Sequence, residues 1–504
     1  MALAVIYSRA SCGIEAPLIT VEVHLSGGMA NFYMVGLPEK AVKESRDRVR
    51  SAIINSNFEF PARRITVNLA PADLPKTGGQ LDLAIALGIL AATRQIPSHQ
   101  LSEYEFTGEL ALSGEIRKVK GVLPMTLAAL SAKRQLIVPS CNAKEAALVS
   151  DANVLYAHSL LEVCAHLCGK SELSPCLPEA QEDATLAAID IADVRGQMHA
   201  KRALFIAASG RHSLLMIGPP GTGKTMLASR LPTLLPNLSN DEAIEVASIA
   251  SLSHTGFYPK RFKQIPFRSP HHSCSSVALA GGGRPPKPGE ISLAHHGVLF
   301  LDELPEFDKK ALECLREPLE SGQITISRAA YQAQFPARFQ FIAAMNPCPC
   351  GYAGSQQDAC HCSPEQIKRY FGKISGPMLD RIDMHIEVPR VPAHLLNITN
   401  QTEEKSAMLR EKVQQVQMRQ YQRQGKCNAL LTVSELNQFA RLEQTAETIL
   451  TETINKLNLS ARVYHRVIKL ARTIADLDAR EMITLSDVSE ALRYRSLDRL
   501  KARM

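Results

Sequence analysis

The chain has 504 residues, of which 45% are hydrophobic and 21% charged, and its 57 Lys and Arg residues against 50 Asp and Glu residues give a formal net charge of +7. This composition is ordinary for globular proteins and excludes a disordered, collagen-like or mainly membrane-embedded chain. No run approaches the roughly 20 apolar residues of a membrane helix, and no basic leader precedes the apolar N-terminus, so we expect no membrane partner and no export signal. Twelve cysteines without an export signal favour reduced thiols in the cytoplasm. The mild positive charge permits a polyanionic partner without requiring one.

The first 170 residues alternate β-rich and helical segments, which is typical of an α+β domain. We predict a strand at 65–70, a buried helix at 81–92 and a strand at 106–112 that leads into a turn. The composition then changes, because residues 171–189 contain prolines and acids with little periodicity. We predict a linker there.

Residues 190–392 alternate strands and helices, which favours an α/β domain with a parallel sheet. Residues 393–504 are almost purely helical. Within them, residues 403–424 are polar on nearly all sides and predict a solvated connector helix, which four shorter amphipathic helices follow.

A glycine-rich loop that matches G-x-x-x-x-G-K-[ST] follows the apolar run 213–217 and precedes a helical run. This is the context that a phosphate-binding loop requires, because the glycines let backbone N–H groups converge on phosphate oxygens at a helix N-terminus. Lys224 is predicted to reach the β- and γ-phosphates, and the Thr225 hydroxyl to bind Mg²⁺. The predicted nucleotide-binding residues are Gly218, Pro219, Pro220, Gly221, Thr222, Gly223, Lys224 and Thr225.

A second buried run, 298–301, ends in two acids, Asp302 and Glu303. Parallel sheets bind ligands at the carboxyl ends of their strands, so we predict that Asp302 holds Mg²⁺ and that Glu303 polarises the attacking water as general base. A third strand, 339–345, ends in Asn346, whose amide is placed to orient that water, although a polar strand end is common by itself. Together these residues predict a nucleoside-triphosphate hydrolase.

Longer stretches carry a family resemblance: 35–45, 269–274, 281–307 and 376–383. On these residues the chain resembles AAA+ ATPases, within them the magnesium-chelatase-like branch, and most closely the ComM/YifB-like family of bacterial competence proteins. The resemblance covers essentially the whole chain. It implies an α/β AAA+ P-loop core with a parallel sheet at 190–392 and a helical lid at 393–504. It also implies that residues 1–170 form an α+β domain similar to that of Lon proteases, of the ribosomal-S5 type.

The resemblance also implies roles that spacing alone does not establish. Asn346 matches the first sensor, Arg381 matches an arginine finger that reaches the nucleotide of the next subunit, and Arg462 matches the second sensor on a lid helix, with Ser460 as its N-cap. Without the family, both arginines read as solvated surface groups. A finger acting across a subunit seam implies a closed homohexameric ring. The predicted catalytic residues are Lys224, Asp302, Glu303, Asn346, Arg381 and Arg462.

The N-terminal domain departs from the Lon pattern at the catalytic positions. Lon-type proteases carry a Ser nucleophile in a Gly-Pro-Ser-Ala-Gly stretch, whereas this chain has Gln80 at the corresponding place. Leu123 or its neighbours stand where the later Lys would be. An amide cannot replace an activated hydroxyl, so we expect a non-proteolytic binding or assembly module.

A four-cysteine cluster follows the strand of Asn346, with the spacing C-x-C-x9-C-x-C. Four thiolates with short spacing within each pair can close a tetrahedral Zn²⁺ site and hold together a loop that has no core of its own. The spacing within the pairs is tighter than the usual C-x2-C, and a reduced cysteine-rich loop is the alternative. The predicted zinc ligands are Cys348, Cys350, Cys360 and Cys362.

Residues 324–335 predict a β-hairpin. In the branch that the chain resembles, such a hairpin projects into the pore of the ring, so Arg328 and Tyr331 at its tip are predicted to hold a phosphate backbone and stack a base. A second flexible basic loop contributes Arg284 and Lys287 to the same channel. Ordinary surface charge is an equal alternative for both.

The leading hypothesis is an ATP- and Mg²⁺-dependent ring that translocates on DNA. The resemblance implies a branch-migration helicase that acts on single-stranded and branched DNA during natural transformation and recombination. Two alternatives stay open: a magnesium-chelatase-type motor that remodels a protein partner, and a non-hydrolysing nucleotide-dependent scaffold. Intact Asp302 and Glu303 count against the scaffold. Fold does not give substrate, so the residues alone separate the DNA motor from the protein remodeller poorly.

Overall fold

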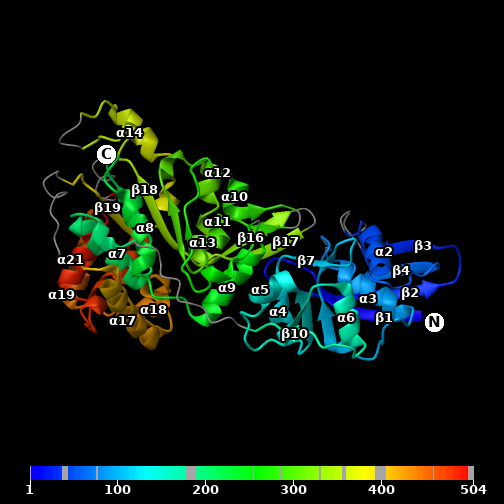
Figure 1. The fold of residues 1–504 in the computed structure, drawn as a ribbon. Helices are drawn as coiled ribbons and strands as arrows, with labels where there is room; N and C mark the ends of the chain where they lie inside the picture. The colour runs from blue at the N-terminus through cyan, green and yellow to red at the C-terminus, as the bar shows by residue number, and fades with distance from the viewer. Residues whose placement is uncertain are drawn as a thin grey trace.

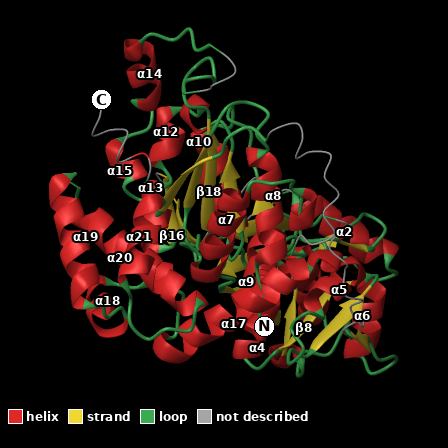
Figure 2. Cartoon of the chain, turned by 90° about the vertical axis from the view of Figure 1, so that its left-hand side faces the viewer, coloured by secondary structure: helices red, strands yellow, loops and turns green. Residues whose placement is uncertain are grey.

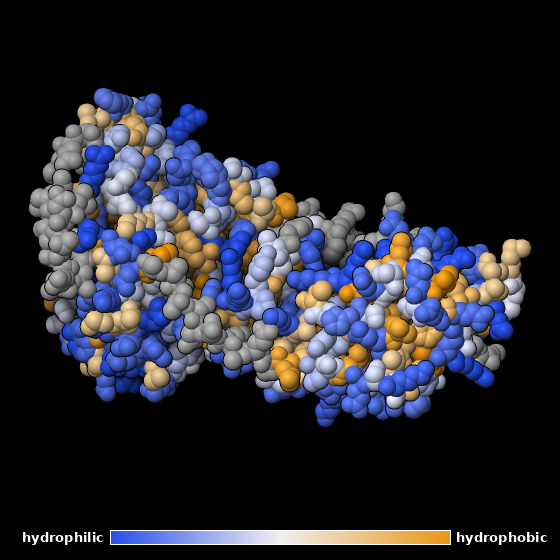
Figure 3. Space-filling view, in the orientation of Figure 1, coloured by the Kyte–Doolittle hydropathy of each residue, from blue (hydrophilic) through white to orange (hydrophobic). Residues whose placement is uncertain are grey.

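The molecule consists of two lobes joined at a narrower waist (Figure 1). On the face shown in Figure 3, hydrophobic residues lie in small groups among hydrophilic ones. Within the described part of the chain, no helix combines the length and the apolar character that crossing a membrane would need. The computed structural model describes residues 2–36, 42, 44–74, 76, 78–177, 189–253, 255–283, 286–328, 331–354, 359–391, 404–457, 459–495 and 497.

The smaller lobe is built on an eight-stranded mixed sheet with the order β10-β9-β8-β5-β1-β2-β4-β3. Helix α3 (Asp82–Ala92) is buried along its whole length and packs on β1 and β2. The predicted strand at 65–70 and the predicted buried helix at 81–92 are confirmed. The strands are β1 Ala2–Arg9, β2 Leu18–Ser26, β3 Asn31–Val35, β4 Arg64–Ala70, β5 Tyr104–Phe106, β8 Gln135–Pro139, β9 Val154–Ala157 and β10 Ser174–Pro175.

The single strand predicted at 106–112 is two strands in two sheets. Strand β5 ends at Phe106, and β6 (Glu109–Leu110) pairs instead with β7 (Ile116–Arg117) in a separate ribbon. Between them, a Cβ on Gly108 would lie 2.4 Å from Cγ2 of Ile116. The chain therefore passes too close to its neighbour for a side chain at the point where it leaves the larger sheet.

The larger lobe contains a parallel sheet with the order β12-β15-β18-β11-β19. Strands β11 (Leu214–Ile217), β15 (Val298–Leu301) and β18 (Gln340–Met345) are buried at every position. Strands β12 (Phe267–Arg268) and β19 (Met384–Glu387) form the edges. Since all five strands run in one direction, the residues that follow β11, β15 and β18 meet at one edge.

The C-terminal helices gather beside this sheet (Figure 2). Ser460 caps α20 by accepting a hydrogen bond from the Val463 N–H, as predicted, and Val463, Val467, Leu470 and Ile474 of α20 are buried. The α/β fold with a helical C-terminal part is confirmed. The helices are α17 Ser406–Gln424, α18 Val433–Phe439, α19 Gln444–Lys456, α20 Ala461–Leu477 and α21 Leu485–Arg493.

The prediction that residues 403–424 form a solvated connector is wrong. Helix α17 packs against α7 (Met198–Gly210) and α8 (Lys224–Leu234). Its glutamines reach the carboxyl end of α7, where the Gln417 side chain donates to the Ala208 carbonyl at 2.8 Å and the Gln420 side chain to the Ser209 carbonyl at 3.2 Å. Polar side chains on a buried face explain why the pattern looked solvated.

The predicted domain boundaries stay predictions. Most of the predicted linker at 171–189, the start of the predicted lid at 393–403, and much of the 35–45 stretch lie outside the described residues. In the described part of the smaller lobe, Gln80 is buried, and its amide donates to the Arg9 carbonyl at 3.1 Å. Leu123 is buried on α4 (Val122–Ser131).

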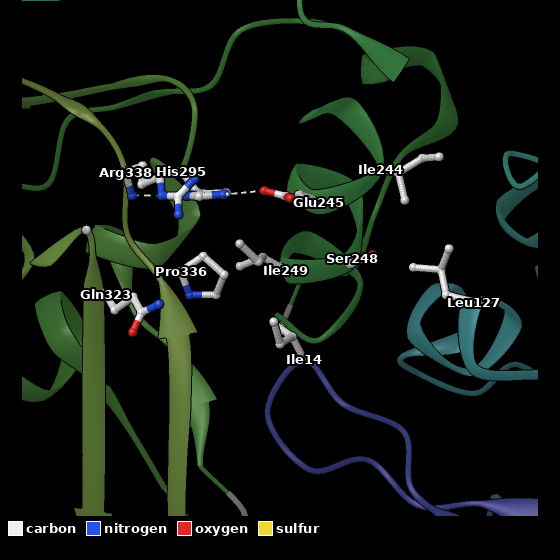
Figure 4. A pocket seen from close by; sticks show the side chains of 11 residues that line it. Ile14, Leu127, Ile244, Glu245, Ser248, Ile249, His295, Gln323, Pro336 and Arg338 are labelled. Carbon is white, nitrogen blue, oxygen red and sulfur yellow. Dashed lines mark hydrogen bonds and ion pairs between the residues drawn. The ribbon is translucent and has the colours of Figure 1, made fainter. Parts of the chain in front are cut away.

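The two lobes meet where α4 packs on α9 (Asn240–Ser251). Leu123 from the smaller lobe joins Ala247 and Phe257 of the larger lobe in one apolar cluster. Beside it lies a cavity of about 230 Å³, lined by Ile14 and Leu127 from one lobe and by side chains of α9 and the hairpin base from the other (Figure 4).

A hydrogen-bonded cluster borders this cavity. Oε2 of Glu245 lies 2.9 Å from Nε2 of both His295 and His296. By type, these three side chains could hold a metal ion. His295 does not fit that role, because its Nδ1 accepts the Arg338 backbone N–H at 3.0 Å, so that its proton must sit on Nε2 and point at Glu245 (Figure 4). The cluster joins α9 to the segments that enter β15 and β18.

Acid is expected to weaken this cluster. Burial lowers the pKa of His295, so the unfolded chain takes up the proton at a higher pH than the folded chain does, and stability falls as pH drops below about 6.5. The largest loss of folding stability that His295 can cause at pH 5.5 is about 1.4 kcal/mol. The hydrogen bonds from the histidines lower the pKa of Glu245 to about 2, so this carboxylate stays charged across the same window.

Urea unfolding at pH 7.5 and pH 5.5 measures this effect. The His295→Gln variant keeps an N–H donor and removes the titration, so we expect its stability to depend less on pH than that of the parent chain. His99→Gln, which changes an exposed histidine, is the control. Equal pH dependence in all three proteins would contradict a titrating His295.

Candidate active site

The predicted phosphate-binding residues are contiguous: 218–223 form the loop that follows β11, and Lys224 and Thr225 begin α8. Gly221 and Gly223 have φ angles of +76° and +85°, which other residues rarely adopt, and a Cβ on either would meet nothing within 4 Å. The loop therefore keeps an open space in front of the first N–H groups of α8. Such a space at a helix N-terminus suits an anion.

The Lys224 ammonium group lies inside this loop. Its Nζ donates to the carbonyls of Gly218 at 2.7 Å and Pro219 at 2.9 Å, and to Oδ1 of Asn346 at 3.2 Å. Burial lowers the pKa of Lys224, against the opposing effects of Asp302 and Glu303. The structure thus brings together Lys224 and Asn346, and the role of Asn346 in orienting water stays a prediction.

Oxygen ligands for Mg²⁺ lie next to the lysine. The Thr225 hydroxyl donates to Oδ2 of Asp302 at 2.5 Å, and the Glu303 backbone N–H donates to Oδ1 of Asp302 at 3.0 Å. A hydroxyl and a carboxylate are hard oxygen donors of the kind that Mg²⁺ prefers, usually completed by water and substrate phosphates. These residues therefore fit the predicted metal.

Glu303 occupies an unusual backbone conformation at the end of β15. Its φ angle is +52°, which a glutamate adopts only when its surroundings impose it, and such residues cluster at functional sites. Nδ1 of His272 lies 2.9 Å from Oε2 of Glu303. Sequence analysis missed this partner, although His272 belongs to the 269–274 stretch that carries the family resemblance.

Arg381 and Arg462 are not part of this constellation. Nη2 of Arg381 donates to Oε1 of Glu320 at 2.5 Å, and Nη2 of Arg462 lies 3.7 Å from the same oxygen. Arg381 is 6% exposed and Arg462 is 59% exposed at the side chain. One carboxylate on α13 (Arg316–Ser321) therefore holds both predicted arginines, and no sequence signal pointed to it.

The strand register explains the separation. Strands β11 and β19 are parallel, with Leu214 opposite Met384. Arg381 precedes β19 and so lies at the amino ends of the parallel strands. Gly218 follows β11 and so lies at their carboxyl ends. Four strand residues at about 3.3 Å each separate these ends by roughly 13 Å. Arg381 thus lies at the end of the sheet opposite to the phosphate loop of its own chain.

The predicted zinc ligands are close together, and the predicted DNA contacts are only partly described. The four Sγ atoms of Cys348, Cys350, Cys360 and Cys362 lie within 4.8 Å of one another. The predicted hairpin is present as β16 (Gln323–Arg328) and β17 (Tyr331–Pro336). Lys287 lies in β14 (Lys287–Pro288). Arg284 and the side chains of Arg328 and Tyr331 lie outside the described residues.

Comparison with known proteins identifies relatives along the whole chain. Competence protein ComM of Haemophilus influenzae is 54% identical over 505 residues, which cover 99% of each chain. The chain belongs to the ComM/YifB-like family of magnesium-chelatase-like proteins. The protein YifB of Escherichia coli is 50% identical over 503 residues, 99% of this chain and 98% of that protein.

The match to magnesium chelatase is broad in extent and distant in sequence. Three family descriptions match the chain: magnesium chelatase subunit ChlI at 190–396, subunit ChlI of Mg-chelatase at 21–142, and the ChlI C-terminal part at 403–495. The magnesium-chelatase subunit ChlI of Anabaena variabilis is 25% identical over 215 residues, 38% of this chain and 57% of that protein.

This membership confirms the predicted family and implies an AAA+ ATPase that uses ATP and Mg²⁺. The geometry around Lys224, Thr225 and Asp302 suits both. The helicase activity, the DNA partner, the hexamer, the zinc ion and the cytoplasmic location stay predictions.

Proposed function

We propose that this protein is an ATP-driven hexameric motor on DNA. It acts as a branch-migration helicase that promotes the integration of incoming DNA in natural transformation and recombination. A relative at 54% identity carries the name competence protein, which supports a role with incoming DNA. The cofactors in this proposal are ATP with Mg²⁺, and Zn²⁺ at the four cysteines.

ATP hydrolysis takes place at the edge formed by the phosphate loop, β15 and β18. Lys224 exchanges its bonds to the Gly218 and Pro219 carbonyls for phosphate oxygens. Thr225 and Asp302 hold Mg²⁺, which when bound neutralises charge on the β- and γ-phosphates. Glu303 accepts the proton of the attacking water as general base, and His272 orients the Glu303 carboxylate.

The site is completed by a neighbouring subunit. Arg381 lies at the opposite edge of the sheet from its own phosphate loop, where Glu320 and the Pro377 carbonyl hold its guanidinium. To serve the nucleotide of the next protomer, Arg381 leaves Glu320 for that protomer's phosphate, and Arg462 joins it at the same seam. Hydrolysis then depends on the neighbour's placement, which couples the sites around a ring.

The observation that carries the DNA part is the contact between the hairpin and the glycine-rich basic turn. A Cβ on Gly281, in β13 (Gly281–Gly282), would lie 2.6 Å from Cδ1 of Ile326 in β16, so the two ribbons touch. Burial lowers the pKa of Lys120, and the positive charge of Lys287 in the partner strand β14 lowers it further. Cationic groups from both lobes therefore lie near each other. Positive charge beside this hairpin suits a phosphate backbone.

A DNA-dependent ATPase assay tests this proposal. We expect single-stranded or four-way-junction DNA to raise ATP turnover, with Lys224→Ala as the blank. Lys287→Ala is expected to weaken DNA binding and to reduce the slope of log affinity against log salt by about 1. Lys456→Ala removes an exposed lysine of α19 and is expected to change neither quantity. If DNA leaves turnover and binding unchanged at low salt, the DNA proposal is wrong.

The competing proposal is a motor that remodels a protein partner. It is supported by the three magnesium-chelatase matches along the chain. In the same assay, stimulation of turnover by a protein partner, with no response to DNA, would favour it.

A further inference from the structure

The four cysteines 348–362 form a compact thiol cluster. Sγ of Cys348 lies 3.2 Å from Sγ of Cys350 and 3.7 Å from Sγ of Cys360, and Sγ of Cys350 lies 3.6 Å from Sγ of Cys360. Cys362 completes a set in which all four sulfurs lie within 4.8 Å of one another. All twelve cysteines of the chain are free, so no disulfide accounts for this grouping.

Two of these separations, 3.6 and 3.7 Å, are close to those of a tetrahedral zinc site, and the Cys348–Cys350 separation of 3.2 Å is shorter. With Zn–S bonds of about 2.3 Å, the sulfurs of a Zn(Cys)4 centre lie about 3.8 Å apart. Cys348 is fully buried, and its sulfur accepts the Ala353 backbone N–H at 3.3 Å. An N–H donor stabilises a thiolate more than a thiol. Four sulfur ligands leave no open position, so the centre is structural and takes no part in the chemistry.

The cluster adjoins the nucleotide site. Cys348 follows Asn346 by two residues, and Asn346 bonds to Lys224. Gly351, which directly follows Cys350, packs against Pro220 of the phosphate loop. A Cβ on Gly351 would lie 2.8 Å from Cδ of Pro220. On the other side, Cys362 is followed at once by Ser363, the N-cap of α14 (Pro364–Phe371).

We propose that these four cysteines bind Zn²⁺ and that the zinc loop holds Asn346 and the phosphate loop in their working positions. The proposal rests on the ATPase activity proposed above. The ion joins the end of β18 to the start of α14, so its loss releases the segment that carries Gly351 away from Pro220. Asn346 and Lys224 then lose their fixed separation, and hydrolysis slows although every residue of the phosphate loop remains.

Metal analysis and ATP turnover on the full chain test this proposal together. We expect one zinc per chain in the parent protein and in the exposed-thiol control Cys141→Ser. Cys350→Ser and Cys360→Ser are expected to lose the zinc and to lower ATP turnover about 10–100-fold, as for other changes that disturb the support of a site. Because these variants could fail to fold, circular dichroism checks their secondary structure. In addition, a chelator removes zinc from the parent chain, and the amount of zinc released is compared with the loss of ATP turnover.

The possible results separate the zinc proposal from the proposed function. If the parent chain loses zinc and ATP turnover together while it stays folded, the proposal is supported. A parent chain without zinc, or with iron in its place, overturns it, as do variants that keep zinc or that lose zinc with full turnover. A chain that holds one zinc but hydrolyses no ATP overturns the proposed function and the coupling, and leaves the metal site standing.

Discussion

Replacing Glu303 with Gln is expected to lower ATP turnover about 10²–10⁴-fold, the usual loss when a general base is removed. The amide keeps the size of the side chain but cannot accept a proton from water. Lys224, Thr225 and Asp302 keep their own contacts, so the affinity for ATP should stay within a few fold. Steady-state phosphate release gives the turnover, and equilibrium binding of a fluorescent ATP analogue gives the affinity.

Glu306 provides a matched control three residues further along the chain. Its exposed carboxylate bonds to Lys373 at 3.0 Å, and it takes no part in the site, so Glu306→Gln should retain the parent rate. A Glu303→Gln chain that hydrolyses ATP at the parent rate would show that the base lies elsewhere. An equal loss of binding and turnover would show that Glu303 holds the nucleotide instead.

The central part of the nucleotide site could be predicted because the sequence signals for it are local. The glycine pattern before Lys224 and the buried strand before Asp302 each identify a strand end from a few consecutive residues. One general rule, that parallel strands bring their carboxyl ends to one edge, is then enough to place Asn346 beside Lys224. The α/β fold class was predicted from the alternation of strands and helices in residues 190–392.

The residues that sequence analysis missed depend on contacts between distant segments. His272 meets Glu303 only because β12 pairs with β15, and Glu320 meets Arg381 across 61 positions of sequence. The glutamines of α17 looked solvated because the pattern counts side-chain polarity and not the carbonyls at the end of α7 that accept their hydrogen bonds. Periodicity records which residues are polar, and tertiary packing decides whether a polar group faces water or a partner.

Two inactive variants are expected to restore each other's activity when they are mixed. Arg381→Ala keeps an intact phosphate loop but lacks the arginine, and loss of such a finger costs about 10³–10⁵-fold in turnover. Lys224→Ala keeps Arg381 but cannot hold the triphosphate. In rings formed from equal amounts, about a quarter of the seams join an intact phosphate loop to an intact Arg381, so turnover should recover to about a quarter of the parent rate.

A second mixture provides the matched control. Lys224→Ala and Asp302→Ala both damage the same edge of one chain, where Thr225 bonds to Asp302 at 2.5 Å, so no seam in their mixed rings holds a complete site. This mixture should stay inactive, while native mass spectrometry shows that mixed rings have formed. If the Arg381→Ala mixture is equally inactive in rings of proven mixed composition, Arg381 acts within its own chain. The separation of about 13 Å between the amino and carboxyl ends of the strands argues against that outcome, because a single arginine side chain cannot span it.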